Sequence, residues 1–342
     1  MTGRLRNTLR LPVAPPLGTV TDALRAARGC LSTTRSPHPV ALWQLAAVLG
    51  HACGPGPFEA RPGGRTGLRY ADADGVRLTA GTNALIPPGG YRYDVVGHAL
   101  VPDGHAGSPH DADLALRLPG GDRSAGARVH LVAAASGLCA RTGPGDPDTL
   151  FLHAPSAARA PAPAPPGTGL ADALAALPAE PPAYLPTPAP LTAEELHALL
   201  RAVAPVPPYW VSVRLVDGVA PGVYRADGAD GAFTAVWHGH TAPLAHVLTR
   251  GGHAAAAALA DAAATVHLVG SGQGPVTEAV RLQTAVFGRG LTAWCDDRPA
   301  PAAAPLLGMG PGGDEVVCHV TLGRARPEPR IRIPLALPGT LP

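Results

Sequence analysis

One short motif occurs twice in this sequence. Residues 87–94 read PPGGYRYD, and residues 220–227 read APGVYRAD, 133 positions further on. The tetrapeptide VHLV follows each copy, at 129–132 and at 266–269, with a separation of 137 positions. Two matches in the same order and at nearly the same separation predict an internal duplication, and a repeat constrains the fold of the whole chain. We therefore expect two related units of about 150 residues each, which together form an internal pseudo-dimer.

The predicted elements favour an α+β fold in each unit. Apolar residues at helical spacing predict a helix within residues 40–52. In the second half, Thr192 and Glu195 form a capping-box pattern in front of a second helix, about 151 positions after the first. Strand patterns follow at 210–216 and 315–322. We expect tandem units in which helices pack on mixed β-sheets.

The boundary between the units is marked by composition. Residues 154–167 are rich in Pro and Ala, which predicts an extended linker. We expect a first unit over 1–153, a linker over 154–190, and a second unit with a C-terminal arm over 191–342. Residues 128–135 are compatible with a buried strand or a short helix, and the first unit has no clear counterpart of the last helix and strand of the second.

The chain contains no lysine, since all 27 basic residues are arginine. This excludes sites built on a lysine, such as P-loops and Schiff bases, but not phosphate binding by arginine. The net charge of +2 indicates no large basic surface, so we expect no nucleic-acid or membrane partner. No run of 18 apolar residues and no apolar signal segment is present, which predicts a cytoplasmic protein.

The cysteines and histidines predict neither a disulfide framework nor a metal site. The five cysteines are odd in number and widely spaced, without a CxxC pair, which favours buried free thiols. His238 and His240 alternate in a strand-like segment, but no carboxylate or cysteine is placed to complete a ligand shell. We therefore expect no bound metal.

Four segments together resemble the nitroreductase family, and specifically the SagB/ThcOx-type dehydrogenases that oxidise azoline rings in ribosomally made peptides. They are TTRSPHPVALWQLAAVLGHACG, GRTGLRYADA, PPGGYRYDVVGHAL, and EAVRLQTAVFGRGLTAWCDD with CHVTLGRARP. The resemblance implies a degenerate tandem version of the nitroreductase fold, FMN as cofactor, and two-electron oxidation of a ring in a precursor peptide. It also implies that the partner is that peptide or another biosynthetic enzyme.

The resemblance assigns site residues by their match to these motifs. An FMN phosphate needs fixed positive charge and backbone N–H groups. The residues assigned to FMN binding are Arg35, Ser36, Gly67, Arg69, Gly290, Leu291 and Arg324. The Lys-Tyr pair of azoline dehydrogenases cannot exist in a chain without lysine, so His38 and Tyr70 are the candidate catalytic bases.

Departures from the family pattern leave other functions open. Thr34 stands where the opening motif usually has arginine, and the second unit has no such motif before its helix. These departures favour a flavin-free degenerate homologue that binds a peptide or a partner enzyme in the same kind of pathway. A third possibility is an α/β hydrolase or transferase that uses the glycine-rich loop at 270–274. Because two fused units can satisfy each other, we expect a monomer or a loose dimer.

Overall fold

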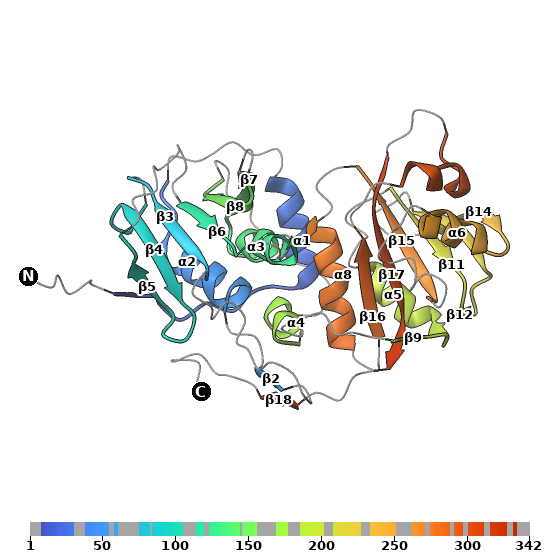
Figure 1. Cartoon of the computed structure of the whole chain (residues 1–342), viewed down its shortest axis with the longest axis horizontal. Helices are drawn as coiled ribbons and strands as arrows, with labels where there is room; N and C mark the ends of the chain where they lie inside the picture. The colour runs from blue at the N-terminus through green and yellow to red at the C-terminus, as the bar shows by residue number, and fades with distance from the viewer. Residues whose placement is uncertain are drawn as a thin grey trace, which may run out of the picture. The chain divides into compact units, whose positions relative to one another are not determined.

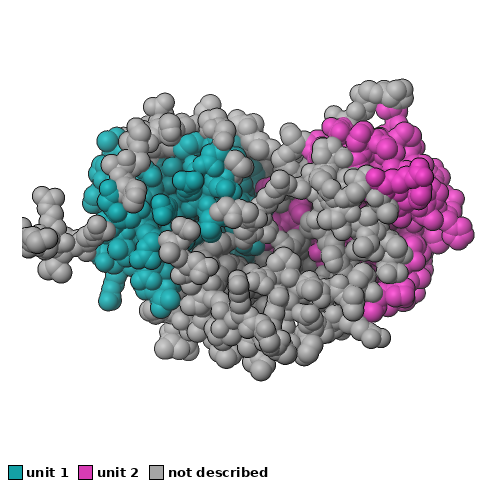
Figure 2. Space-filling view, viewed as in Figure 1, with its two compact units in different colours: residues 1–181, 329–342 teal, residues 182–328 magenta. Residues whose placement is uncertain are grey.

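The computed structural model describes residues 8–30, 38–54, 58–60, 75–82, 84–104, 114–119, 123–143, 146–155, 169–176, 185–201, 208–226, 233–250, 262–270, 274–287, 291–296, 300–310, 315–326 and 331–333. They belong to two compact units, coloured separately in Figure 2. Unit 1 comprises residues 1–181 and 329–342, and unit 2 comprises residues 182–328. No helix among the described residues is long and apolar enough to cross a membrane.

Unit 1 contains a seven-stranded antiparallel sheet with the strand order β1-β5-β4-β3-β6-β8-β7 (Figure 1). These strands are β1 (Leu9–Arg10), β3 (Arg77–Ala80), β4 (Gly89–Asp94), β5 (Ala99–Pro102), β6 (Leu114–Arg117), β7 (Cys139–Gly143) and β8 (Asp146–His153). The helical elements are α1 (Val20–Gly29), α2 (Leu42–Ala47), η2 (Val48–Ala52), α3 (Arg123–Ala135) and α4 (Leu170–Ala176). Helix α3 packs against α1, η2, β7 and β8. The short strand β2 (Phe58–Ala60) pairs with β18 (Ile331–Ile333).

Unit 2 contains a sheet with the order β14-β13-β11-β15-β17-β16, and β9 pairs with β17 beside this path. These strands are β9 (Leu185–Thr187), β11 (Tyr209–Val213), β13 (Gly222–Ala226), β14 (Phe233–His238), β15 (Ala264–Val269), β16 (Leu291–Asp296) and β17 (Val316–Arg326). The helical elements are α5 (Ala193–Arg201), α6 (Ala242–Arg250), α8 (Gly274–Phe287), η3 (Pro301–Ala303) and η4 (Pro305–Leu307). All ladders of this sheet are antiparallel, where mixed sheets were expected. A parallel pair joins β10 (Leu191–Thr192) to β12 (Val216–Asp217) outside it.

The segment 154–190, for which we expected an extended linker, contains α4 and β9. Helix α4 belongs to unit 1, and β9 belongs to unit 2. The expected C-terminal arm of unit 2 contains β18, which pairs with β2 in unit 1. These short elements form in spite of the Pro- and Ala-rich composition because each packs on or pairs with another element: α4 with α1 and η2, β9 with β17, and β18 with β2.

Six strands follow the same order in the two sheets. The series β5-β4-β3-β6-β8-β7 of unit 1 matches β14-β13-β11-β15-β17-β16 of unit 2. One helix stands at the same place in each series, since α3 lies between β6 and β7 along the chain, and α8 lies between β15 and β16. Unit 1 therefore has a counterpart of the last helix and strand of unit 2, which the sequence patterns did not reveal.

The motif that contains Pro, Gly and Tyr has the same local structure in both units. The hydroxyls of Tyr91 in β4 and Tyr224 in β13 each donate to the carbonyl oxygen four residues earlier, over 2.6 and 2.7 Å. Each strand begins with a glycine, Gly89 with φ 150° and Gly222 with φ 159°. The match in sequence therefore marks equivalent positions in the two sheets.

The VHLV match, by contrast, joins two different elements. Residues 129–132 lie in helix α3, whereas residues 266–269 lie in strand β15. The strand of unit 1 that holds the place of β15 is β6, which precedes α3. Four residues are too short a window to separate helical from strand periodicity, so this half of the predicted repeat was wrong.

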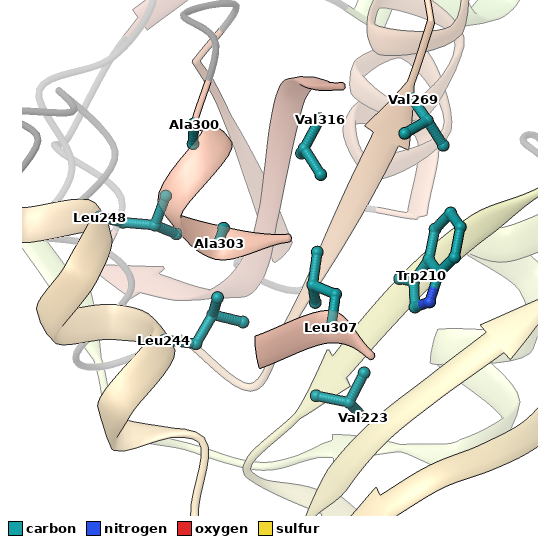
Figure 3. Packing of buried hydrophobic residues seen from close by; sticks show 9 residues of the cluster. All are labelled: Trp210, Val223, Leu244, Leu248, Val269, Ala300, Ala303, Leu307 and Val316. Carbon is teal, nitrogen blue, oxygen red and sulfur yellow. The ribbon is translucent and has the colours of Figure 1, made fainter. Parts of the chain in front are cut away.

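Both faces of the sheet in unit 2 are covered. On one face, Trp210 and Val223 converge with Leu244 of α6 and Leu307 of η4, as Figure 3 shows. On the other face, Thr277 of α8 lies 3.2 Å from the sulfur of Cys318 in β17. Burying one large aliphatic side chain contributes about 1.5–3 kcal/mol. This apolar packing also holds in place the buried polar side chains of the same strands, such as Ser212 and His267.

Two of the five cysteines form a disulfide, which corrects the expectation of free thiols. Cys30 follows α1 and is bonded to Cys139, the first residue of β7, with the two Cα atoms 5.3 Å apart. Cys53 and Cys318 are buried and do not take part in a disulfide. The bonded cysteines are 109 positions apart, and it is the packing of α1 against α3 that brings them together. Sequence spacing carries no information about such a contact.

Candidate functional site

Two residues that the resemblance assigns to FMN binding meet in unit 2. Leu291 begins β16, and Arg324 lies opposite it in β17. Opposite residues of an antiparallel pair have Cβ atoms about 5 Å apart. The register therefore places the backbone of Leu291 directly opposite that of Arg324.

The guanidinium of Arg324 is held by groups at the start of α5. Its Nη2 donates to both carboxylate oxygens of Glu195 over 2.9 Å, and its Nε donates to the carbonyl oxygen of Pro190 over 3.1 Å. Glu195 also accepts the backbone N–H of Thr192 over 2.9 Å, and the hydroxyl oxygen of Thr192 accepts the N–H of Glu195 over 3.1 Å. The predicted capping box is confirmed, and its carboxylate also binds an arginine.

The ion pair is largely shielded from water. The side chain of Glu195 is 6% exposed, and that of Arg324 is 24% exposed. Burial alone would raise the pKa of Glu195, but hydrogen bonds from the Thr192 backbone and from Arg324 outweigh it and hold the pKa below its usual value. The carboxylate is therefore ionised at neutral pH, and its charge cancels that of the guanidinium.

This arrangement does not fit the phosphate-binding role that the resemblance assigns to Arg324. A flavin phosphate is an anion, and its binding requires positive charge that is not already compensated. A phosphate placed on Arg324 would lie beside the carboxylate of Glu195, and two negative charges at such a distance repel each other. The described residues at this corner therefore provide hydrogen-bond donors but no net positive charge.

Of the other sequence-predicted site residues, the described part of the chain contains His38. His38 belongs to unit 1, in the loop before α2, and its side chain is exposed. The remaining assigned residues lie outside the described residues: Arg35, Ser36, Gly67, Arg69, Tyr70 and Gly290. Residues 271–273 of the glycine-rich loop also lie outside them.

The sheet of unit 2 contains a buried array of hydrogen-bonded side chains that the sequence did not predict. The Oγ of Ser212 in β11 lies 3.0 Å from Nε2 of His267 in β15, whose Nδ1 lies 2.8 Å from Nδ1 of His319 in β17. All three residues are at most 6% exposed. Burial and the neighbouring His319 lower the pKa of His267 well below its usual value, so this ring is neutral at pH 7.

The array is specific to unit 2. Tyr91 and Tyr224 are equivalent, so the cross-strand pairs next to them identify the matching residues of the two sheets. Thr79 of unit 1 corresponds to Ser212, Arg117 to His267, and Thr149 to His319. In the sequence, each of the three residues interrupts a run of β-branched or apolar residues: Ser212 and His319 in the strands predicted at 210–216 and 315–322, and His267 in the VHLV segment. Such isolated polar residues in buried strands are the signal that could have located the array.

Replacing Arg324 by Met should lower the free energy of unfolding by about 2 kcal/mol at pH 7, because Glu195 then stays buried without its cation. The loss should shrink in acid. The pKa of Glu195 is lower in the folded protein than in the unfolded chain, so the ion pair stabilises the fold fully above the unfolded-state pKa of about 4.3. This stabilisation is lost as the pH falls through the folded-state pKa. Urea unfolding at neutral and acidic pH measures both effects. Glu194→Gln, an exposed neighbour, is the control, and equal losses at both pH values would contradict the ion-pair assignment.

Comparison with solved structures agrees with this architecture. The crystal structure of a "putative nitroreductase" from Anabaena variabilis superposes on the chain with a TM-score of 0.54 at 14% sequence identity, and the match covers 95% of this chain and 93% of that chain. No family model matches the sequence, and no curated protein matches it either. A likeness at this level of identity concerns the fold and not the activity. From the strand order, the helices and this match, we conclude that the chain has a nitroreductase-like α+β fold.

Proposed function

We propose that this protein is a flavin-free binding protein with a nitroreductase-like fold, which binds an extended segment of a ribosomally made precursor peptide. The observation that carries the proposal is the ion pair between Arg324 and Glu195. It neutralises the closing arginine on which phosphate binding in the resembled family depends. The fold is then retained for binding rather than for flavin chemistry.

The edge strand β14 of unit 2, as far as the described residues show it, supports binding of an extended chain. We take the two units as copies of one duplicated unit, so that β14 is the counterpart of β5. In unit 1, β1 adds to β5 by pairing Leu9 with Leu100 and Arg10 with Ala99. Within the described residues β14 pairs with β13, and most of its side chains are exposed. A peptide strand added to β14 would occupy the place that β1 occupies in unit 1.

A second candidate function is an FMN-dependent oxidoreductase that oxidises an azoline-type ring in such a peptide. It is favoured by the fold and by the juxtaposition of Leu291 and Arg324. Bound FMN would supply the two-electron redox chemistry, while the protein would hold and orient the peptide.

Titration of the purified full-length protein with FMN separates the two functions. We expect colourless protein and no saturable quenching of flavin fluorescence, because Glu195 compensates the charge of Arg324. Glu195→Gln removes the competing carboxylate and should make the quenching of flavin fluorescence saturable, because the charge of Arg324 is then no longer compensated by Glu195. Glu194→Gln is the matched control and should change nothing. Yellow wild-type protein with stoichiometric FMN would overturn the proposal in favour of the oxidoreductase.

Strand addition at β14 has its own readout. A synthetic peptide that copies residues 7–13, the segment around β1, serves as the probe. At millimolar concentration it should slow hydrogen exchange in β14, because main-chain hydrogen bonds to the edge protect its amides. The same peptide with N-methylated backbone nitrogens lacks these donors and should give no protection. Equal exchange with both peptides would contradict binding at this edge.

A further inference from the structure

A small cavity lies between the sheet of unit 2 and the first turn of α6. Its volume is about 20 Å³, and its polar lining consists of Ser212, Arg214, Thr241 and Thr265. None of the residues that line it in the described part of the chain is Asp or Glu. The cavity belongs neither to the Arg324 corner nor to the edge strand β14.

Arg214 brings a positive charge to this cavity, and no acidic side chain is paired with it among the described residues. Its Nε donates to the carbonyl oxygen of Ala262 over 2.8 Å. Its Nη2 is buried and has no hydrogen-bond partner among the described residues. A buried donor without an acceptor costs about 1–3 kcal/mol, and more when it is charged. An acceptor inside the cavity would remove this cost.

The end of α6 adds to the positive potential. Thr241 precedes the helix, and its carbonyl oxygen accepts the N–H groups of Leu244 and Ala245 over 3.1 and 3.3 Å. The helix has nine residues and no acidic residue in its first turn. The N-terminus of such a helix carries a partial positive charge that favours an anion.

The buried array determines what Ser212 can offer to the cavity. The two facing Nδ1 atoms of His267 and His319 can share a single hydrogen. If His319 donates it, Nε2–H of His267 donates to Ser212, and the serine hydroxyl is free to donate into the cavity. If His267 donates it, Ser212 must donate to His267 and turns its lone pairs to the cavity. The arrangement in which His319 donates places the hydroxyl of Ser212 as a further donor beside Arg214, and this arrangement suits an anion.

We infer that the cavity binds one small monovalent anion of about the size of chloride, held by Arg214 and Ser212 beside the start of α6. The space inside the cavity, about 20 Å³, holds one water-sized particle, and chloride is an anion close to that size. We therefore assign Ser212, with His267 and His319 behind it, to binding this anion and not to nucleophilic catalysis. Charge selects an anion over water, since Arg214 supplies a cation without an acid in the lining.

Chloride titration of the full-length protein tests this site. At constant ionic strength, with gluconate as the replacing anion, chloride should raise the melting temperature saturably, by about 3 °C at a tenfold excess over Kd. Arg214→Met should abolish the rise, and Ser212→Ala should weaken chloride binding about fivefold. Arg250→Met removes an exposed arginine at the other end of α6 and should leave the rise unchanged.

A direct measurement uses wild-type protein alone, so it does not depend on the folding of any variant. Crystals soaked in sodium bromide should show an anomalous peak in the cavity, within hydrogen-bonding distance of Arg214 Nη2 and Ser212 Oγ. A single water without anomalous signal would overturn the proposal. Identical melting temperatures in chloride and gluconate would overturn it as well.

Discussion

Substituting Cys30 by Ser is expected to lower the free energy of unfolding by about 4 kcal/mol. The bond between Cys30 and Cys139 closes a loop of 109 positions. In the chain-entropy account, a cross-link over about 100 residues stabilises the folded state by about 4.7 kcal/mol, and measured losses are about 2–5 kcal/mol. The effect extends over most of unit 1, because the bond joins the end of α1 to the start of β7.

Chemical denaturation with and without a reducing agent measures this effect. Reduced wild-type protein should unfold at the same denaturant concentration as Cys30→Ser, and the reductant should not affect the variant. Cys139→Ser should cost the same, and the double variant should cost no more than either single one. Thiol titration of the unfolded wild-type protein should give two thiols fewer than its five cysteines. Five reactive thiols without reductant would contradict the bond.

Gly222→Ala is expected to cost about 4 kcal/mol, and Gly89→Ala only about 2 kcal/mol, although the two glycines occupy equivalent positions in the repeated motif. Both have positive φ, which an L-residue adopts at a cost of about 1–3 kcal/mol. At Gly222 an added Cβ would also collide with the carbonyl oxygen of Trp237 and lie 3.0 Å from the Cα of His238. At Gly89 it would meet nothing within 4 Å. Backbone atoms cannot move aside as a flexible side chain can, so the overlap adds about 2 kcal/mol.

Thermal and urea unfolding of both variants check the difference, each variant serving as the control for the other. Circular dichroism at low temperature should show that both fold before they are compared. The close approach of β13 and β14 at Gly222 explains the larger loss, since Gly222 is paired with His238. Equal losses in the two variants would mean that backbone conformation alone accounts for the effect, and that this close approach is not formed.

The elements with a local cause could be predicted from the sequence. The helix within residues 40–52 follows from apolar spacing, and Leu45, Ala46 and Leu49 are buried as that spacing requires. The capping box of Thr192 and Glu195 follows from two residues three positions apart. VHLV failed because neither copy extends far enough to show a period, and its neighbours decided the structure of each copy.

The candidate sites could be predicted only in part. Leu291 and Arg324 were assigned together by resemblance, and the register of β16 and β17 places them opposite each other. The partner of Arg324 was missed because Glu195 is 129 positions away and was assigned only its capping role. Arg214 carries no local signal of its role, because the burial of its Nη2 depends on the packing of α6 and β15 around it.

The nitroreductase-like fold was predicted from the resemblance of four motifs to that family. The helix within residues 40–52 and the capping box before the second helix were predicted from apolar spacing and a pair of residues, because these signals act over a few positions. Which distant groups meet depends on the tertiary structure: Cys30 with Cys139, Arg324 with Glu195, and Ser212 with the two histidines. These contacts depend on strand order and register, which bring together residues from 52 to 129 positions apart. Tertiary structure therefore pairs the charge of Arg324 with Glu195 and places the donors around the small cavity. Both proposed functions rest on these contacts.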